Sequence, residues 1–133
     1  MAGQATLAIS LKVTGIGDDI NVSNSQTLTV PVETQSGYTV ITTATTTAIQ
    51  LFDFITAIAL AKIYGVYIKA VSGTILLGVD TAGTGTLTAT TADLILYEGE
   101  ATYIPINAGG NLGLVMDGLA VTDAAQWVIL GKA

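Results

Sequence analysis

The chain has 133 residues, with four lysines as its only basic residues, ten acidic residues and a net charge of −6. A chain of this length forms one domain, residues 1–133, and buries roughly two-thirds of its unfolded surface. It contains neither cysteine nor histidine, so the usual general base and the commonest zinc ligand are missing. We therefore predict no enzyme, no metal or cofactor and, because arginine is also absent, no nucleic-acid partner.

The low proportion of charged residues is the most informative feature of the composition. Only 11% of the residues are charged, whereas an ordinary soluble domain has about 25%. Such a chain is expected to cover apolar surface with partner molecules. A membrane is the alternative, but Asp53 and Lys62 interrupt the longest apolar stretch, and a spanning helix requires roughly 18–20 apolar residues. The first residues also lack the pattern of a signal peptide, so we predict an assembly without a membrane.

Residues 5–14 (ATLAISLKVT) alternate between apolar and polar side chains, which predicts a strand with one apolar face. The sequence GIGDD at residues 15–19 ends this strand. A second strand is predicted over residues 26–33, and Pro31 favours an edge position for it because proline cannot donate a ladder hydrogen bond.

A third strand is predicted over residues 38–47, after a turn at Ser36-Gly37. No charged residue occurs between Glu33 and Asp53, so nothing there opposes pairing with another strand edge. We expect the first and third strands to provide the contact surfaces of an assembly. The candidate interface residues are Leu7, Ile9, Leu11, Val13, Thr43 and Thr45.

Two strand-like runs, residues 62–71 and 74–79, flank Ser72-Gly73 and predict a central hairpin. In the first run Val66 and Ile68 belong to an apolar face, while Tyr67 and Lys69 belong to a partly wet one. Before them, one short helix is possible near residues 53–61, although the alternation there also fits a strand.

The second half of the chain consists of short apolar runs separated by Gly, Asp and Asn. The runs are residues 87–92, 94–97, 101–106, 112–116 and 126–130. Regularly spaced short strands predict an all-β fold, an antiparallel β-sandwich or a jelly-roll-like barrel.

Several residues that suggest chemistry have a simpler interpretation. Asp18-Asp19 fits a calcium loop only in part, and acidic residues in glycine-rich turns are usually solvated. Glu98 and Glu100 are a carboxylate pair, but their spacing across Gly99 indicates a turn and not a glycosidase site. The glycine- and threonine-rich residues 81–91 lack the lysine of a phosphate-binding loop.

The aromatic residues suggest a platform for a sugar, although aromatics in small sandwiches are more often core or interface residues. The candidates are Tyr64, Tyr67, Tyr97, Tyr103 and Trp127. A glycan-binding module requires an exposed Trp127, whereas a structural subunit predicts a buried one.

The order of motifs from residue 62 to residue 130 resembles one family. YGVYIK at residues 64–69 is followed by residues 75–79, by LYEGE at residues 96–100 and by YIPI at residues 103–106. This progression is similar to that of the small β-sandwich structural proteins of tailed bacteriophages, particularly capsid decoration or cement proteins. Gly99-Glu100 and Ile104-Pro105 match the last part of the pattern, whereas Lys69-Ala70 departs from the more usual asparagine.

The resemblance implies a non-enzymatic virion protein made in the host cytoplasm. It implies binding to the outer surface of the major capsid protein lattice, often as a homotrimer. A tail or head-fibre component and a glycan-binding β-sandwich module remain as alternatives. A subunit of a bacterial surface or compartment layer shares the assembly argument without the resemblance.

Overall fold

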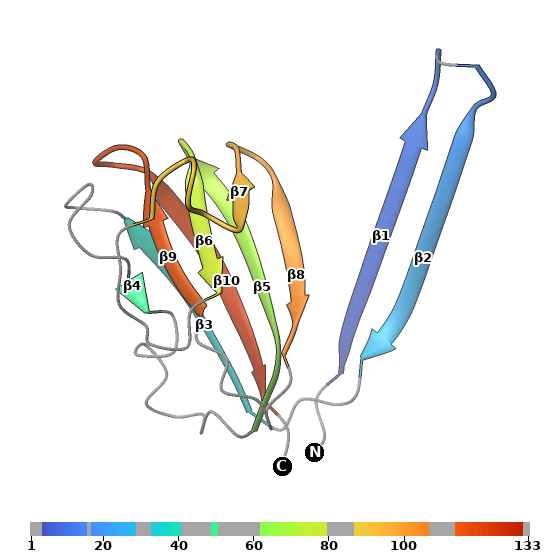
Figure 1. Ribbon diagram of the computed structural model, residues 1–133. Helices are drawn as coiled ribbons and strands as arrows, with labels where there is room; N and C mark the ends of the chain where they lie inside the picture. Colours follow the sequence, from blue (N-terminus) through green and yellow to red (C-terminus); the bar gives the residue numbers. More distant parts are fainter. Residues whose placement is uncertain are drawn as a thin grey trace.

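The computed structural model describes residues 4–15, 17–28, 33–40, 49–50, 62–79, 87–106 and 114–131. These residues form two four-stranded antiparallel sheets and a separate two-stranded hairpin (Figure 1). The strands are β1 (Ala5–Val13), β2 (Ile20–Leu28), β3 (Glu33–Val40), β4 (Ile49–Gln50), β5 (Ile63–Ser72), β6 (Ile75–Val79), β7 (Leu94–Leu96), β8 (Ala101–Pro105), β9 (Leu114–Gly118) and β10 (Ala124–Gly131). The predicted all-β antiparallel sandwich is confirmed, and the sheets do not close into a barrel. The helix considered near residues 53–61 lies outside the described residues.

The core lies between the two sheets. The first sheet has the strand order β3-β10-β5-β8 and the second has the order β4-β9-β6-β7. Alternate residues of the central strands point into the core because successive side chains of a strand point to opposite faces. The core includes Val66, Ile68, Ala125, Trp127 and Ile129 from the first sheet and Ile75, Leu77, Leu114 and Met116 from the second. The predicted apolar face of residues 62–71 is therefore the buried one.

The predicted central hairpin is wrong, although both of its strands exist. β5 pairs with β10 and β8, whereas β6 pairs with β9 and β7, so the chain passes from one sheet to the other between them. A two-residue type I′ hairpin requires positive φ at both central residues, and here only Gly73 has one, at 69°. The two apolar strands therefore face each other across the core and do not share a ladder.

The predictions for the N-terminal third need two further corrections. β2 begins at Ile20, six residues before the predicted strand, and pairs with β1 along its full length. Ser36-Gly37 is not a turn, because both residues lie inside β3 opposite Val128 and Trp127. The Trp127 ring lies against Gly37, and a Cβ at this position would overlap it. Glycine at this position thus reflects close packing.

The predicted strand at residues 87–92 is also wrong. Thr88 and Thr91 close a turn in which the Thr88 amide donates to the Thr91 hydroxyl at 2.9 Å. The Ala92 amide donates to the Thr88 carbonyl at 2.9 Å. Threonine hydroxyls compete with the sheet for backbone groups in this way, so β-propensity alone misleads. The later runs correspond to β7, β8, β9 and β10 with small shifts of their ends.

Candidate interaction surface

The hairpin of β1 and β2, with the turn between them, stands apart from the sandwich and is called the arm (residues 5–28) (Figure 1). Its strands are antiparallel, and directly paired residues share a face. Leu11 pairs with Val22, and Val13 pairs with Ile20. One face, called the apolar arm face, carries Leu7, Ile9, Leu11, Val13, Ile20 and Val22, with Gln26 and Asn24 opposite Leu7 and Ile9 near the base. The opposite face carries mainly Thr, Ser and Asn side chains, with Lys12.

The apolar arm face is largely exposed in the single chain. Ile9, Leu11 and Val22 are 57–58% exposed and Ile20 is 50% exposed. Covering these four half-exposed side chains would gain on the order of 3–6 kcal/mol. A lone two-stranded hairpin is at best marginally stable in water. The arm therefore presents a surface that gains stability from a partner.

The second element of the site is the outer face of the first sheet, which points away from the core. Its side chains lie in rows set by the strand register. Ser36, Val128, Tyr67 and Tyr103 form one row, and Tyr38, Gln126, Lys69 and Ala101 form the next. Lys69 is the only charged residue in these two rows. This surface is called the outer sheet face.

Tyr103 lies flat on the outer sheet face because Gly65 makes room for it. A Cβ on Gly65 would overlap the phenol of Tyr103. Burial raises the pKa of Tyr103 above its ordinary value of 10.0. Burial, and secondarily the charge of Tyr103, also raises the pKa of the nearby Tyr64. Both phenols are thus neutral near pH 7 and provide hydroxyl groups without charge.

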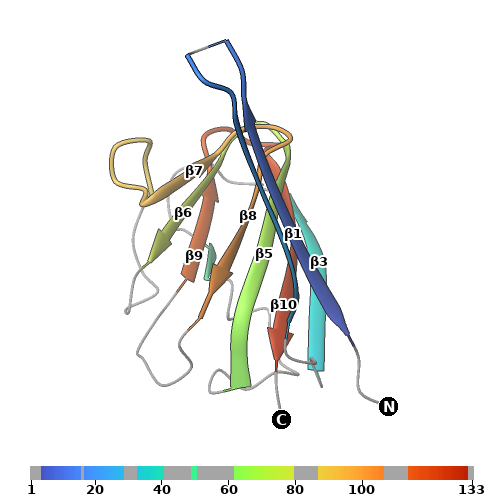
Figure 2. The same ribbon diagram turned by 90° about the vertical axis from the view of Figure 1, so that its right-hand side faces the viewer.

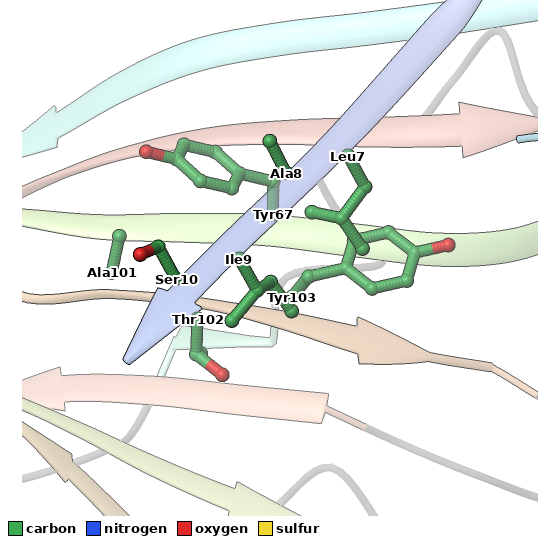
Figure 3. A pocket seen from close by; sticks show the side chains of 8 residues that line it. All are labelled: Leu7, Ala8, Ile9, Ser10, Tyr67, Ala101, Thr102 and Tyr103. Carbon is green, nitrogen blue, oxygen red and sulfur yellow. The ribbon is translucent and has the colours of Figure 1, made fainter. Parts of the chain in front are cut away.

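A groove separates the arm from the outer sheet face. Its volume is about 510 Å³, within the range of small-molecule sites. Figure 3 shows β1 crossing above β5 and β8 over this groove. The lining residues are Leu7, Ala8, Ile9 and Ser10 from β1 and Tyr67, Ala101, Thr102 and Tyr103 from the sheet. The groove is thus apolar and aromatic, with hydroxyl groups and no charged side chain.

The base and the tip of the arm differ in how much of them the sandwich of the same chain covers. Near the base, Leu7 is partly buried and lines the groove. At the tip, Leu11 and Val22 are each 57% exposed, and the turn that joins β1 to β2 extends past the end of the sandwich, as both views show (Figures 1 and 2). The sandwich of the same chain therefore leaves the tip uncovered.

The structure brings four of the six predicted interface residues onto one surface. Leu7, Ile9, Leu11 and Val13 all belong to the apolar arm face. Thr43 and Thr45 lie outside the described residues. The contribution of Ile20 and Val22 was not predicted from the sequence, because the Asn- and Ser-rich residues around them look like a loop. Their alternation with Asn21 and Ser23 was the available signal.

The acidic candidates have structural roles or are solvated. The Gly73 amide donates to Glu98 Oε2 at 3.3 Å, and the Tyr97 amide donates to Glu100 Oε2 at 2.9 Å, so both glutamates support turns. Asp18 and Asp19 are exposed in the turn of the arm. Within the described ranges, no three acidic side chains come together as a metal site would require.

The aromatic candidates separate into two groups. Trp127 is only 4% exposed, and its indole N–H donates to Thr39 Oγ1 at 3.0 Å. It therefore cannot stack on a sugar from solvent. Tyr67 and Tyr103 pair across β5 and β8 on the outer sheet face, whereas Tyr97 is exposed beyond β7. Tyrosines, and not the tryptophan, therefore form the aromatic surface of the described residues, and Tyr67 and Tyr103 are the two that line the groove.

Comparisons with protein-family models, with curated proteins and with solved structures found no match. Among the residues that the structure describes, no helix has the length and apolar character to cross a membrane.

Proposed function

We propose that this protein is a non-enzymatic virion subunit that decorates a bacteriophage capsid. It binds the outer surface of the major capsid protein lattice, acts as a homotrimer and stabilises the shell. The single observation that carries the proposal is the apolar arm face, whose side chains at Ile9, Leu11, Ile20 and Val22 are at least half exposed. A protein that keeps such a surface in water is built to cover it in an assembly.

The charge distribution supports an assembly subunit. The apolar arm face carries no charge, and the outer sheet face carries only Lys69 in its two described rows. Charged residues are generally depleted at the centre of protein interfaces. Many copies on one shell would also gain avidity from contacts that are weak one at a time. The function is then a matter of surface burial and not of bond chemistry.

The test is the copy number of the protein on particles from its source. Particles are separated on a density gradient, and the DNA-filled fraction is analysed by quantitative mass spectrometry. A copy number close to that of the major shell protein is expected. A few copies per particle would assign the protein to a tail or head fibre instead, and absence from particles would overturn the virion proposal.

Variants test which surfaces of the protein are responsible for binding to particles. The pair Leu11→Ser and Val22→Ser is expected to lower occupancy on particles, because it makes the tip of the apolar arm face polar. Lys12→Ser, on the opposite face of the same strand, is the matched control. The pair Thr43→Lys and Thr45→Lys tests the second predicted contact strand, and unchanged particle binding would remove that strand from the interface.

A glycan-binding module is the second candidate, favoured by the groove. Tyr67 and Tyr103 supply aromatic rings with phenol hydroxyl groups there, and Ser10 supplies a further hydroxyl group. Binding of the isolated protein to a sugar panel, lost in Tyr103→Ala, is the result expected of this function. Such binding together with absence from particles would favour it over decoration.

A further inference from the structure

We propose that the arm of one copy lies on the outer sheet face of a second copy, so that copies exchange arms around a closed ring. The starting point is that one chain carries two uncovered surfaces of matching character. The apolar arm face is mainly aliphatic, and fully so at the tip, and the outer sheet face presents Val128, Tyr67 and Tyr103. This inference names the partner of the arm and does not depend on the capsid proposal.

The dimensions of the two surfaces match. Both strands of the arm have nine residues, and the central strands β5 and β10 of the sheet have ten and eight. Strands of equal length span equal distances, because each residue adds about 3.3 Å. An arm laid along a sheet of this size is covered from base to tip. The sandwich of its own chain does not achieve this, because the tip extends past its end (Figures 1 and 2).

Charge permits a second copy of the chain as the partner of these surfaces. Each copy has a net charge of −6, so two copies attract only through surfaces that exclude the acidic residues. Glu98 and Glu100 lie in the turn between β7 and β8, and Asp18 and Asp19 lie in the turn of the arm. The apolar arm face and the two rows of the outer sheet face contain no acidic residue. They are surfaces on which like-charged copies can meet.

In the single chain, the base of the arm already lies across the groove from the outer sheet face of the same chain. At the base, Leu7 and Ile9 line the same groove as Tyr67 and Tyr103 (Figure 3). Exchange of an identical element between copies reuses contacts that a single chain makes, at low cost. A head-to-tail ring then covers every arm and every sheet, whereas an open chain leaves one of each uncovered.

The first experiment measures mass. Analytical ultracentrifugation of the full chain across a dilution series is expected to give a closed oligomer, three times the chain mass of 13.5 kDa for a trimer. The pair Leu11→Ser and Val22→Ser should shift it to the monomer, and Lys12→Ser should leave it unchanged. A wild-type protein that stays monomeric at all concentrations would overturn arm exchange.

The second experiment locates the contact without assuming its register. p-Benzoylphenylalanine is placed at position 11 on the apolar face, or at position 12 on the opposite face as the control. Equal amounts of unlabelled and ¹⁵N-labelled protein are refolded together and irradiated. Position 11 should cross-link to β3, β5, β8 or β10 of a differently labelled copy in about half of the products, as random mixing requires. It should exceed position 12 by about tenfold, because neighbouring side chains of a strand point to opposite faces.

The outcomes are separable from those of the capsid test. Cross-links only within one copy, or only between two arms, would overturn arm exchange. A monomer found at high copy number on particles would overturn arm exchange and the homotrimer, and would leave binding to the capsid intact. An arm-exchanged oligomer that is absent from particles would overturn decoration and leave arm exchange intact.

Discussion

Trp127 in β10 lies against Gly37 in β3, its partner across the ladder, with no side chain between the indole ring and the strand backbone. The indole N–H reaches two residues along the same strand and donates to Thr39 Oγ1 at 3.0 Å. The missing side chain of Gly37 and the hydroxyl group of Thr39 thus position the only tryptophan of the chain in the core. The pair joins the edge strand β3 to the central strand of the first sheet.

Gly37→Ala is expected to destabilise the fold by about 1–3 kcal/mol, because the new methyl group would overlap the Trp127 ring. Alanine normally suits a strand better than glycine does, so the sign of the effect tests the close packing. Urea denaturation followed by the fluorescence of Trp127 measures it. Ser36→Ala, at the exposed neighbouring position, is the control and should stay within about 0.5 kcal/mol of the wild type. A Gly37→Ala variant as stable as the wild type would contradict this packing.

Thr39→Val is expected to cost about 1–2 kcal/mol, because valine keeps the shape of threonine but removes the hydroxyl that accepts the indole N–H. Thr39→Ser keeps the hydroxyl and is the matched control, with a smaller loss. The same urea titration applies. Equal stabilities of the valine and serine variants would show that this hydrogen bond contributes nothing.

The sequence was sufficient to predict the strands in which apolar and polar residues alternate regularly. β1 was predicted to within one residue, because four aliphatic residues at every second position specify both the strand and its face. The buried face of β5 was predicted for the same reason. Four of the six candidate interface residues followed from that pattern in β1 alone.

The failures share a physical cause, since each depended on a contact distant in sequence. Ser36-Gly37 looks like a turn until the Trp127 ring, about 90 residues later, is placed against it. β5 and β6 look like a hairpin because local pattern does not specify which sheet each strand joins. The outer sheet face combines residues from four strands, so no single stretch of sequence reveals it.

Asp117 is expected to make the folded state less stable as pH rises, which is the opposite of the usual effect of a carboxyl group. Its carboxyl is 1% exposed; Oδ1 accepts the Gly118 N–H at 2.8 Å, and Oδ2 has no hydrogen-bond partner. Burial raises the pKa of this carboxyl above its ordinary value of 3.8, against the opposing effect of the Gly118 hydrogen bond. The folded state therefore binds the proton more tightly than the unfolded state does. The stabilisation is complete below 3.8 and is lost as pH rises through the raised pKa.

The comparison of wild type with Asp117→Asn isolates this contribution, because the other carboxyl groups are common to both proteins. The free energy of unfolding is measured by urea titration from about pH 3 to about pH 7. The variant should gain stability relative to the wild type as pH rises across this range. Asp18→Asn makes the same charge change at an exposed position and is the control. A difference between Asp117→Asn and wild type that does not vary with pH would contradict the effect of burial.

The arm and the core are expected to respond differently to polar substitutions of aliphatic residues. In dilute monomeric protein, the pair Leu11→Ser and Val22→Ser should change the stability of the sandwich by less than about 0.5 kcal/mol, because both side chains are more than half exposed. Ile68→Ala, at a fully buried position, should cost about 2–5 kcal/mol. Trp127 lies in the sandwich core and reports on this unit alone during urea titration. A loss of about 2 kcal/mol or more in the arm variant would mean that the sandwich depends on the arm. A small loss, combined with loss of assembly, would assign the aliphatic residues of the tip to contact between molecules.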